Sequence, residues 1–351
     1  MITIFTPSFA DEANTNAQNL TGKEVVSRLS PDRFRVMMLG DGAPDPRILA
    51  RPNTEILPFR RSGNTARWLT RLLLSRIDIY FFPRTGPLDS LFLFSRRWLR
   101  LPVAVVTYVV TDVGGRALDP IMTRGILEAD SVVGNSRYVS QMVADRFGVS
   151  TGTVYDGVRQ DWFYPAPQAR PAVSPLTVLY AGSFQPLKRA DIVIREAAKR
   201  PTVEFRLAGK GIEEQKLRSL VDELGCRNVI FVGHLSQQGL AEEMRRADVF
   251  FFPSALEGHP QVLVQAAASG LPAVAMEKYR PDYVVNGKTG YLAKSDDELL
   301  EKLSLLLDTP ELRVKMSAAA ARHALQFDWD KVARDWENLF VEVAGKIRKK
   351  R

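Results

Sequence analysis

EGHPQVLVQAAASGLP, residues 257–272, is the stretch of sequence that decides the fold. It follows an apolar run at 247–253 that is rich in Val and Phe, which is typical of a buried parallel strand. A glycine and a proline then interrupt the regular backbone, and a helix is predicted over 261–268 that ends before Gly270, where glycine suits a left-handed cap. Another apolar run follows. The stretch therefore predicts a strand, a tight turn, a helix and a second strand.

The turn at the start of this stretch has the properties of an anion site. It lies at the carboxyl end of a predicted strand, where open α/β sheets bind ligands. The backbone N–H groups at the start of the following helix have no partner within the helix and can hold a phosphate. Glu257 places one carboxylate beside them. The alternative is an ordinary strand-to-helix turn in which Glu257 complements the helix dipole.

The order of residues in this stretch resembles the signature of the retaining GT-B glycosyltransferases of family 4, also called glycosyltransferase group 1. An acidic residue and glycine are followed at the family's spacing by a small-residue helix and Gly-Leu-Pro. Gln265 stands where the family has a second glutamate, so the spacing is kept and the charge is lost. The resemblance covers nearly all of the C-terminal half of the chain, but only the strand ends of the N-terminal half.

The resemblance implies an α/β fold of GT-B type, with two Rossmann-like domains whose parallel sheets face an interdomain cleft. A chain of 351 residues is long enough for two cores. We expect an acceptor-binding domain at 1–165, a nucleotide-sugar-binding domain at 166–326 and a C-terminal helix at 327–351 that crosses back to the first domain. The boundary at 165/166 falls in a proline-rich segment that is typical of a linker.

The implied reaction moves a hexose from a UDP- or GDP-linked sugar to a glycan or lipid-linked acceptor with retention of configuration. Such reactions serve cell-envelope polysaccharide or glycolipid synthesis. The nucleotide-sugar is a co-substrate, and no cofactor is expected. Catalytic roles are implied for Glu257 and Lys188 and, at the end of a predicted strand in the first domain, for Asp112.

A donor site is implied along the strand ends of the second domain. The family has an arginine where Ser183 stands and a lysine where Lys188 stands, and these two cations clamp the donor diphosphate. Arg189 is a further cation at a helix start, where positive charge opposes the helix dipole and so indicates an anion. The expected donor-binding residues are Gly182, Ser183, Lys188, Arg189, Gly209, Gly233, His234, Leu235, Glu257, Gly258, His259, Pro260, Gln261, Val262 and Gln265.

The first domain carries the expected acceptor site. No G-x-G-x-x-G follows the first predicted strand, which argues against a nicotinamide cofactor. The polar loop there can donate hydrogen bonds to sugar hydroxyls, or it can simply cap the next helix. None of the three histidines falls in this half of the chain, which excludes a catalytic histidine there. The expected acceptor-binding residues are Asn14, Thr15, Asn16, Gln18 and Asn135.

Metal and disulfide chemistry are not expected. Asp328-Trp329-Asp330 has the form of a D-x-D metal motif, but its position at a helix start suits a cap and a first-turn acid instead. Cys226 is the single cysteine, so no internal disulfide can form, which fits a cytoplasmic protein. The apolar start of the chain lacks a basic leader and no window offers the ~20 apolar residues of a membrane helix.

Much of the net charge of +8 is concentrated in one segment. From Phe59 to Arg100 there are nine arginines, no lysine and two acids, which gives +7, and aromatic and leucine residues lie between them. Such a segment can contact an anionic membrane surface through Arg60–Arg100, on the inner face of the membrane, or an anionic acceptor. It can also be a set of solvated helix faces. No nucleic-acid-binding module is present, so nucleic acid is not expected as a partner.

A second class of function stays open at this point. The missing arginine at Ser183 and the missing glutamate at Gln265 would also fit a GT-B-like binding protein that has lost catalysis. A phosphorylase-type or epimerase-type enzyme of the same fold has no supporting residues in the sequence.

Overall fold

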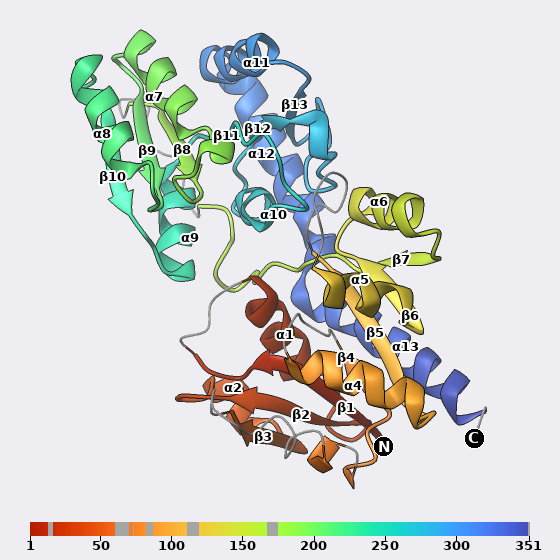
Figure 1. Cartoon of the computed structure of the whole chain (residues 1–351). Helices are drawn as coiled ribbons and strands as arrows, with labels where there is room; N and C mark the ends of the chain where they lie inside the picture. Colours follow the sequence, from red (N-terminus) through yellow and green to blue (C-terminus); the bar gives the residue numbers. More distant parts are fainter. Residues whose placement is uncertain are drawn as a thin grey trace. The chain divides into compact units, whose positions relative to one another are not determined.

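The computed structural model describes residues 1–12, 17–59, 70–72, 74–81, 87–110, 119–166 and 175–349. These residues form two compact units, each built on a parallel sheet with helices on both faces (Figure 1). Unit 1 comprises Met1–Asp156 and Trp329–Arg351, and unit 2 comprises Gly157–Asp328. The predicted GT-B-type α/β fold, with two Rossmann-like sheets, is confirmed.

Unit 1 carries a seven-stranded sheet in the order β3-β2-β1-β4-β5-β6-β7. All neighbouring strands pair in parallel. The strands are β1 (Ile2–Phe9), β2 (Phe34–Gly40), β3 (Thr54–Pro58), β4 (Ile79–Phe81), β5 (Ala104–Val109), β6 (Ser131–Gly134) and β7 (Thr151–Thr153). The helices are α1 (Ala17–Arg28), α2 (Pro46–Ala50), α4 (Pro87–Trp98), α5 (Pro120–Leu127), α6 (Arg137–Phe147) and α13 (Trp329–Arg348).

Both faces of the unit 1 sheet are buried, which follows from strands that are apolar at successive positions. On β1, Ile4 faces a core that includes the C-terminal helix, while Phe5 faces a second core that includes α4. Since side chains alternate across a strand, one apolar run supplies both cores. The polar-to-apolar alternation of a one-sided sheet is therefore missing from these strands.

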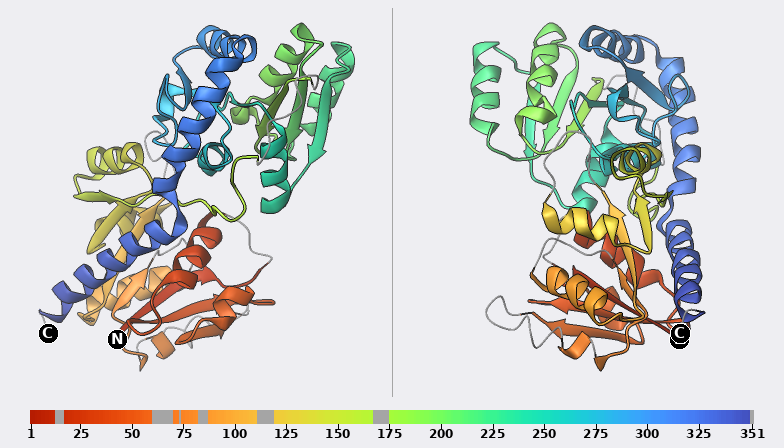
Figure 2. Two further views of the ribbon diagram at one scale, coloured as in Figure 1. Left: turned by 180° about the vertical axis from the view of Figure 1, so that it is seen from behind. Right: turned by 45° about the vertical axis from the view of Figure 1, so that its right-hand side comes forward.

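The C-terminal helix α13 belongs to unit 1 although it follows unit 2 in the chain. Its buried positions recur every three or four residues, so they form one apolar stripe. Trp336 is fully buried, and its ring centroid lies 4.8 Å from that of Phe81 and 4.9 Å from that of Tyr108. Near the far end of the helix, Arg348 donates a hydrogen bond to the carbonyl oxygen of Met1 at 3.0 Å, and Figure 2 shows the two chain ends close together.

Unit 2 carries a six-stranded sheet in the order β10-β9-β8-β11-β12-β13, again parallel throughout. The strands are β8 (Thr177–Ala181), β9 (Glu204–Ala208), β10 (Val229–Gly233), β11 (Val249–Phe252), β12 (Ala273–Met276) and β13 (Gly290–Ala293). The α-helices are α7 (Ala190–Lys199), α8 (Glu214–Glu223), α9 (Gln237–Arg246), α10 (Gln261–Ala268), α11 (Asp296–Asp308) and α12 (Pro310–Ala324). Short 3₁₀ turns are η1 (Pro186–Lys188), η2 (Glu277–Tyr279) and η3 (Leu325–Phe327).

Each sheet has the strand order of a dinucleotide-binding Rossmann fold, in which the chain reverses direction across the sheet beside the first strand. In unit 2 this reversal lies between β8 and β11, so the loops that follow these two strands meet at one edge. The predicted helix at 261–268 is α10, and it follows β11 as expected. None of the described helices is long and apolar enough to cross a bilayer.

Candidate functional site

The loops at the carboxyl edge of the unit 2 sheet are held together by backbone hydrogen bonds. Gly182 donates to the carbonyl of Ala208 at 3.0 Å, and Gly209 donates to the carbonyl of Gly233 at 2.8 Å. Phe184 donates to the carbonyl of Lys210 at 3.0 Å. The loops after β8, β9 and β10 therefore form one connected wall.

Glycine is required in this wall because the loops approach more closely than a side chain allows. Gly209 has a φ of +153°, and a Cβ on it would lie 1.9 Å from the carbonyl oxygen of Gly182. A Cβ on Gly211 would lie 2.3 Å from the carbonyl oxygen of Phe184. Only glycine relieves both the backbone strain and the contact at position 209.

A pocket of about 350 Å³ opens at this edge. It includes six of the expected donor-binding residues, together with residues that the sequence did not single out. The lining residues are Ala181, Gly182, Ser183, Ala208, Gly209, Lys210, His234, Leu235, Gln237, Leu240 and Val262. Six of the fifteen predicted donor-binding residues therefore line one concave site within unit 2.

Lys188 and Glu257 form an ion pair, although they are 69 positions apart in the chain. Lys188 is the last residue of η1 after β8, and Glu257 lies in the turn between β11 and α10. The Ser254 hydroxyl donates to Oε1 of the same carboxylate at 2.6 Å, which fixes its orientation. The Nζ atom of Lys188 lies 5.9 Å from the centre of the Phe252 ring. The structure thus brings one cation and one carboxylate to the point where the two strand ends meet.

The charge of Glu257 affects two buried phenols. Burial raises the pKa of the Tyr180 hydroxyl, and the negative charge of Glu257 raises it further. Burial and the same carboxylate raise the pKa of Tyr279 as well. Both phenols therefore stay protonated at neutral pH and can act only as neutral hydrogen-bonding groups.

The start of α10 has no side-chain cap. Pro260 is the N-cap residue and makes no side-chain cap, so no side chain satisfies the first amides of the helix. The amide nitrogen of the Gln261 side chain is buried and has no hydrogen-bond partner among the described residues. His259 is buried and stacks on Tyr283 with ring centroids 3.7 Å apart, so its ring packs within the unit.

Gln265 is linked to the pocket indirectly. It lies in the second turn of α10 and is buried. Its side-chain amide donates to Oε1 of Gln237 at 2.7 Å, and Gln237 lines the pocket. Arg189, in contrast, forms an ion pair with Asp296 at the start of α11, so Lys188 is the cation that reaches Glu257.

The predicted residues of the first domain are only partly described. Asn14, Thr15, Asn16 and Asp112 lie outside the described residues, and for Gln18 only its place in α1 is described. Asn135 is buried after β6, and its side-chain amide donates to Oδ2 of Asp156 at 3.0 Å. Thr21 and Tyr108 donate to the other oxygen of that carboxylate, at 2.9 and 3.0 Å. Asn135 thus forms part of a buried network that joins four separate segments of unit 1.

Three residues at this edge of the sheet were not predicted from the sequence. Lys210 lies between the two glycines that the sequence marks as a strand-end turn, so the same strand-end rule would have included it. Ser254 follows β11 directly and could have been selected in the same way. The role of Gln237 carried no local signal, because its contact with Gln265 spans 28 positions.

Residues 167–323 match the protein family described as "Glycosyl transferases group 1". This part of the chain, which is most of unit 2, is similar to the group 1 glycosyl transferases. The matched range contains every residue that lines the pocket, together with both members of the ion pair.

The chain is also similar to a curated protein, D-inositol 3-phosphate glycosyltransferase of Streptomyces scabiei. It is 32% identical over 222 residues, which are 56% of this chain and 50% of that protein. The chain therefore spans about half the length of the curated relatives it matches.

Solved structures show the same fold over nearly the whole chain. Sucrose-phosphate synthase of Thermosynechococcus elongatus superposes with a TM-score of 0.78 at 18% identity, covering 99% of this chain and 100% of that one. HepE of Anabaena, solved in complex with UDP, superposes with a TM-score of 0.77 at 16% identity, covering 97% and 100%. At such identities the likeness concerns the fold alone.

Proposed function

We propose that the protein is a retaining, metal-independent glycosyltransferase that moves a hexose from a nucleotide-sugar to a glycan or lipid-linked acceptor. The observation that carries the proposal is the Lys188–Glu257 pair beside the glycine-walled pocket of unit 2. The match of residues 167–323 to the group 1 glycosyl transferases supports it. The uridine nucleotides bound by HepE, UDP and UDP-glucose, make a UDP-sugar the first donor to test.

Each group at the site has a role in this reaction. Lys188 and the free amides at the start of α10 neutralise the diphosphate, and the open amide of Gln261 donates to one of its oxygens. The pocket between the loops after β8, β9 and β10 holds the nucleoside. Glu257 leaves Lys188 for the sugar hydroxyls when the donor binds.

The chemical step exchanges one glycosidic bond for another. The bond from the anomeric carbon to the diphosphate oxygen breaks, and a bond to the acceptor oxygen forms on the same face of the sugar. The acceptor proton passes to the departing diphosphate. Positive charge on the sugar and negative charge on the diphosphate grow together, so Glu257 and Lys188 stabilise the transition state more than the ground state.

Thermal unfolding in the presence of UDP, GDP or ADP, without added metal, tests the donor site. A nucleotide at about 100 times its Kd stabilises the folded state by about 2.7 kcal/mol. For a unit of this size that corresponds to roughly 5–10 °C. We expect UDP to give this shift, Lys188→Ala to reduce it, and Lys199→Ala to leave it unchanged. Lys199 is the matched control because it is also paired with a glutamate, Glu196, but lies on the outer face of α7.

A binding protein without transferase activity is the second candidate. It is favoured by Ser183 and by Gln265, whose amide is engaged with Gln237 instead of presenting a carboxylate. Measuring UDP binding and sugar transfer for the unaltered chain and for Glu257→Gln distinguishes an enzyme from a binding protein. In an enzyme this substitution abolishes sugar transfer and leaves UDP binding within a few-fold. In a binding protein the unaltered chain already shows binding and no transfer.

The acceptor is proposed to be lipid-linked and reached at an anionic membrane surface. Within Arg60–Arg100, the described part of the segment exposes three apolar residues on one side of α4, namely Leu91, Phe94 and Trp98. Arginines follow on the same helix. Exposed apolar side chains beside arginines are typical of helices that lie in the bilayer interface.

A further inference from the structure

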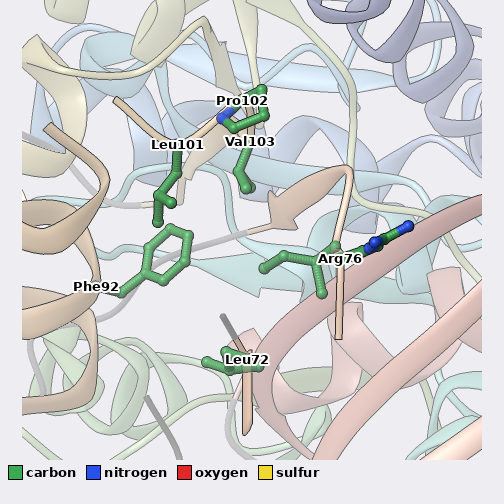
Figure 3. A pocket seen from close by; sticks show the side chains of 7 residues that line it. Leu72, Arg76, Phe92, Leu101, Pro102 and Val103 are labelled. Carbon is green, nitrogen blue, oxygen red and sulfur yellow. The ribbon is translucent and has the colours of Figure 1, made fainter. Parts of the chain in front are cut away.

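A second pocket lies in unit 1, away from every residue assigned to sugar transfer. Its volume is about 290 Å³ (Figure 3). It lies where the chain enters β4 and β5, at the amino edge of the sheet, whereas the predicted acceptor residues follow the carboxyl ends of the strands. Four of the residues that line it, Leu72, Arg76, Ile77 and Phe92, fall in the Arg60–Arg100 segment that the sequence predicts to contact an anionic surface.

The walls of this pocket are almost entirely apolar. Leu72, Ile77 and Phe92 are buried side chains of the core on this face of the sheet. Leu101 and Val103 close the opposite side, as Figure 3 shows. No lining residue is acidic. An apolar pocket of this size does not hold ordered water well, because water needs two or more polar partners.

Two arginines belong to the segments that line the pocket, and neither has an acidic partner among the described residues. Arg76 lines it, and in Figure 3 its guanidinium nitrogens point away from Phe92 and Leu101. Arg100 directly precedes Leu101 in the chain and is exposed. Among the described residues neither guanidinium has an ion pair, whereas the neighbouring Arg96 and Arg97 pair with Asp130 and Glu128.

The backbone at both arginines is unusual. Arg76 has a φ of 48° and Arg100 has a φ of 49°, and each ends a helical segment. Glycine is the common residue at such left-handed helix ends because it has no Cβ to strain. Arginine therefore occupies two left-handed positions, where glycine is favoured, in the segments that line one apolar pocket.

We propose that this pocket binds one acyl chain of an anionic membrane phospholipid, with the headgroup phosphate on Arg76 and Arg100. The apolar wall suits an acyl chain, and the guanidinium groups of Arg76 and Arg100, which have no ion pair within the described part of the chain, suit the phosphate. The exposed Leu74, Phe94 and Trp98 lie on the helical segments that flank the pocket, so they enter the bilayer interface beside it. The inference narrows the proposed contact with an anionic surface to a defined site, and it does not depend on sugar transfer.

Calorimetric titration with monomeric lysophosphatidylglycerol tests the site directly. Each buried methylene contributes roughly fourfold to affinity, so a decanoyl chain, which is two methylenes longer, is expected to bind about 15-fold more tightly than an octanoyl chain. Lysophosphatidylcholine of equal chain length is expected to bind at least tenfold more weakly, because its headgroup carries no net charge.

Variants separate the pocket from its charged mouth. Leu101→Trp and Val103→Phe fill the pocket and are expected to weaken decanoyl binding at least tenfold and to remove its advantage over octanoyl. Arg76→Ser/Arg100→Ser is expected to remove the preference for the anionic headgroup. The matched control is Arg227→Ser/Arg280→Ser, which changes the charge equally at two exposed arginines of unit 2, one of them also left-handed with a φ of 42°.

The result that overturns the inference is decanoyl binding that either pocket-filling variant leaves unchanged while its melting temperature matches the parent. Binding that fails to saturate at one lipid per chain overturns it as well. Co-sedimentation with phosphatidylglycerol vesicles distinguishes binding of one lipid in the pocket from contact with an anionic membrane surface. Vesicle binding without binding of the monomeric lipid rejects the pocket but supports the surface contact. Normal UDP binding by a variant shows that its change in lipid binding does not come from the donor site.

Discussion

Gly209→Ala tests whether the close approach of two loops builds the donor pocket. A Cβ at this position would lie 1.9 Å from the Gly182 carbonyl oxygen, whereas ordinary contacts begin at 3.4 Å. The loops after β8 and β9 must therefore separate by more than an ångström. Such overpacking costs about 1–3 kcal/mol. The φ of +153° adds a backbone cost of about 1–3 kcal/mol for any residue with a Cβ.

Gly287→Ala is the matched control, because this glycine lies in the same unit at a φ of +74° and its Cβ would meet nothing within 4 Å. It loses only the backbone contribution, so the two variants differ by the contact with Gly182. We expect Gly209→Ala to melt about 2–12 °C below Gly287→Ala, since each kcal/mol shifts the melting temperature of a unit of this size by about 2–4 °C. UDP binding should also weaken only in Gly209→Ala, because its loop lines the pocket. Equal melting temperatures and equal UDP affinities in the two variants would refute the reasoning.

Three further predictions concern unit 1. Trp336→Ala removes a fully buried ring from between Phe81 and Tyr108 and should lower the free energy of unfolding by about 3–5 kcal/mol, measured by denaturant titration; a loss below 1 kcal/mol would mean that α13 does not hold the unit together. Asp156→Ala leaves the buried donors of Thr21 and Asn135 without their acceptor, while Tyr108 keeps the carbonyl of Val154, and should cost about 3 kcal/mol, whereas the exposed Asp145→Ala should cost little. Burial alone would raise the pKa of Asp45, but the hydrogen bonds and charge of Arg47 hold it below 3.8. Its contribution to stability is therefore complete above pH 3.8 and lost as the pH falls through the folded-state pKa, so Asp45→Asn should flatten the stability curve in that acid range, and an unchanged curve would contradict the assignment.

Local sequence was sufficient for the elements around the deciding stretch. The helix predicted over 261–268 is α10 at those residues, because the preceding glycine and proline, the small apolar residues and Gly270 all act within a few positions. The GT-B-type fold followed from the same kind of evidence: apolar runs long enough for strands alternate with helical patterns, and that alternation produces parallel sheets. The strand β3 was not predicted from the sequence.

What the sequence by itself determined about this protein is the succession of strands and helices, the glycine-marked turns and the resemblance of its C-terminal half to the group 1 glycosyl transferases. The tertiary structure alone decided which of these residues meet. Lys188 reaches Glu257 because β8 and β11 are neighbours in the sheet, an order that no local pattern encodes. Asn135 is turned to Asp156, and α13 joins unit 1, for the same reason: burial of apolar surface and pairing of buried polar groups are satisfied over the whole chain at once. The apolar pocket beside Arg76 likewise exists only where two strand entries and two helices come together in space.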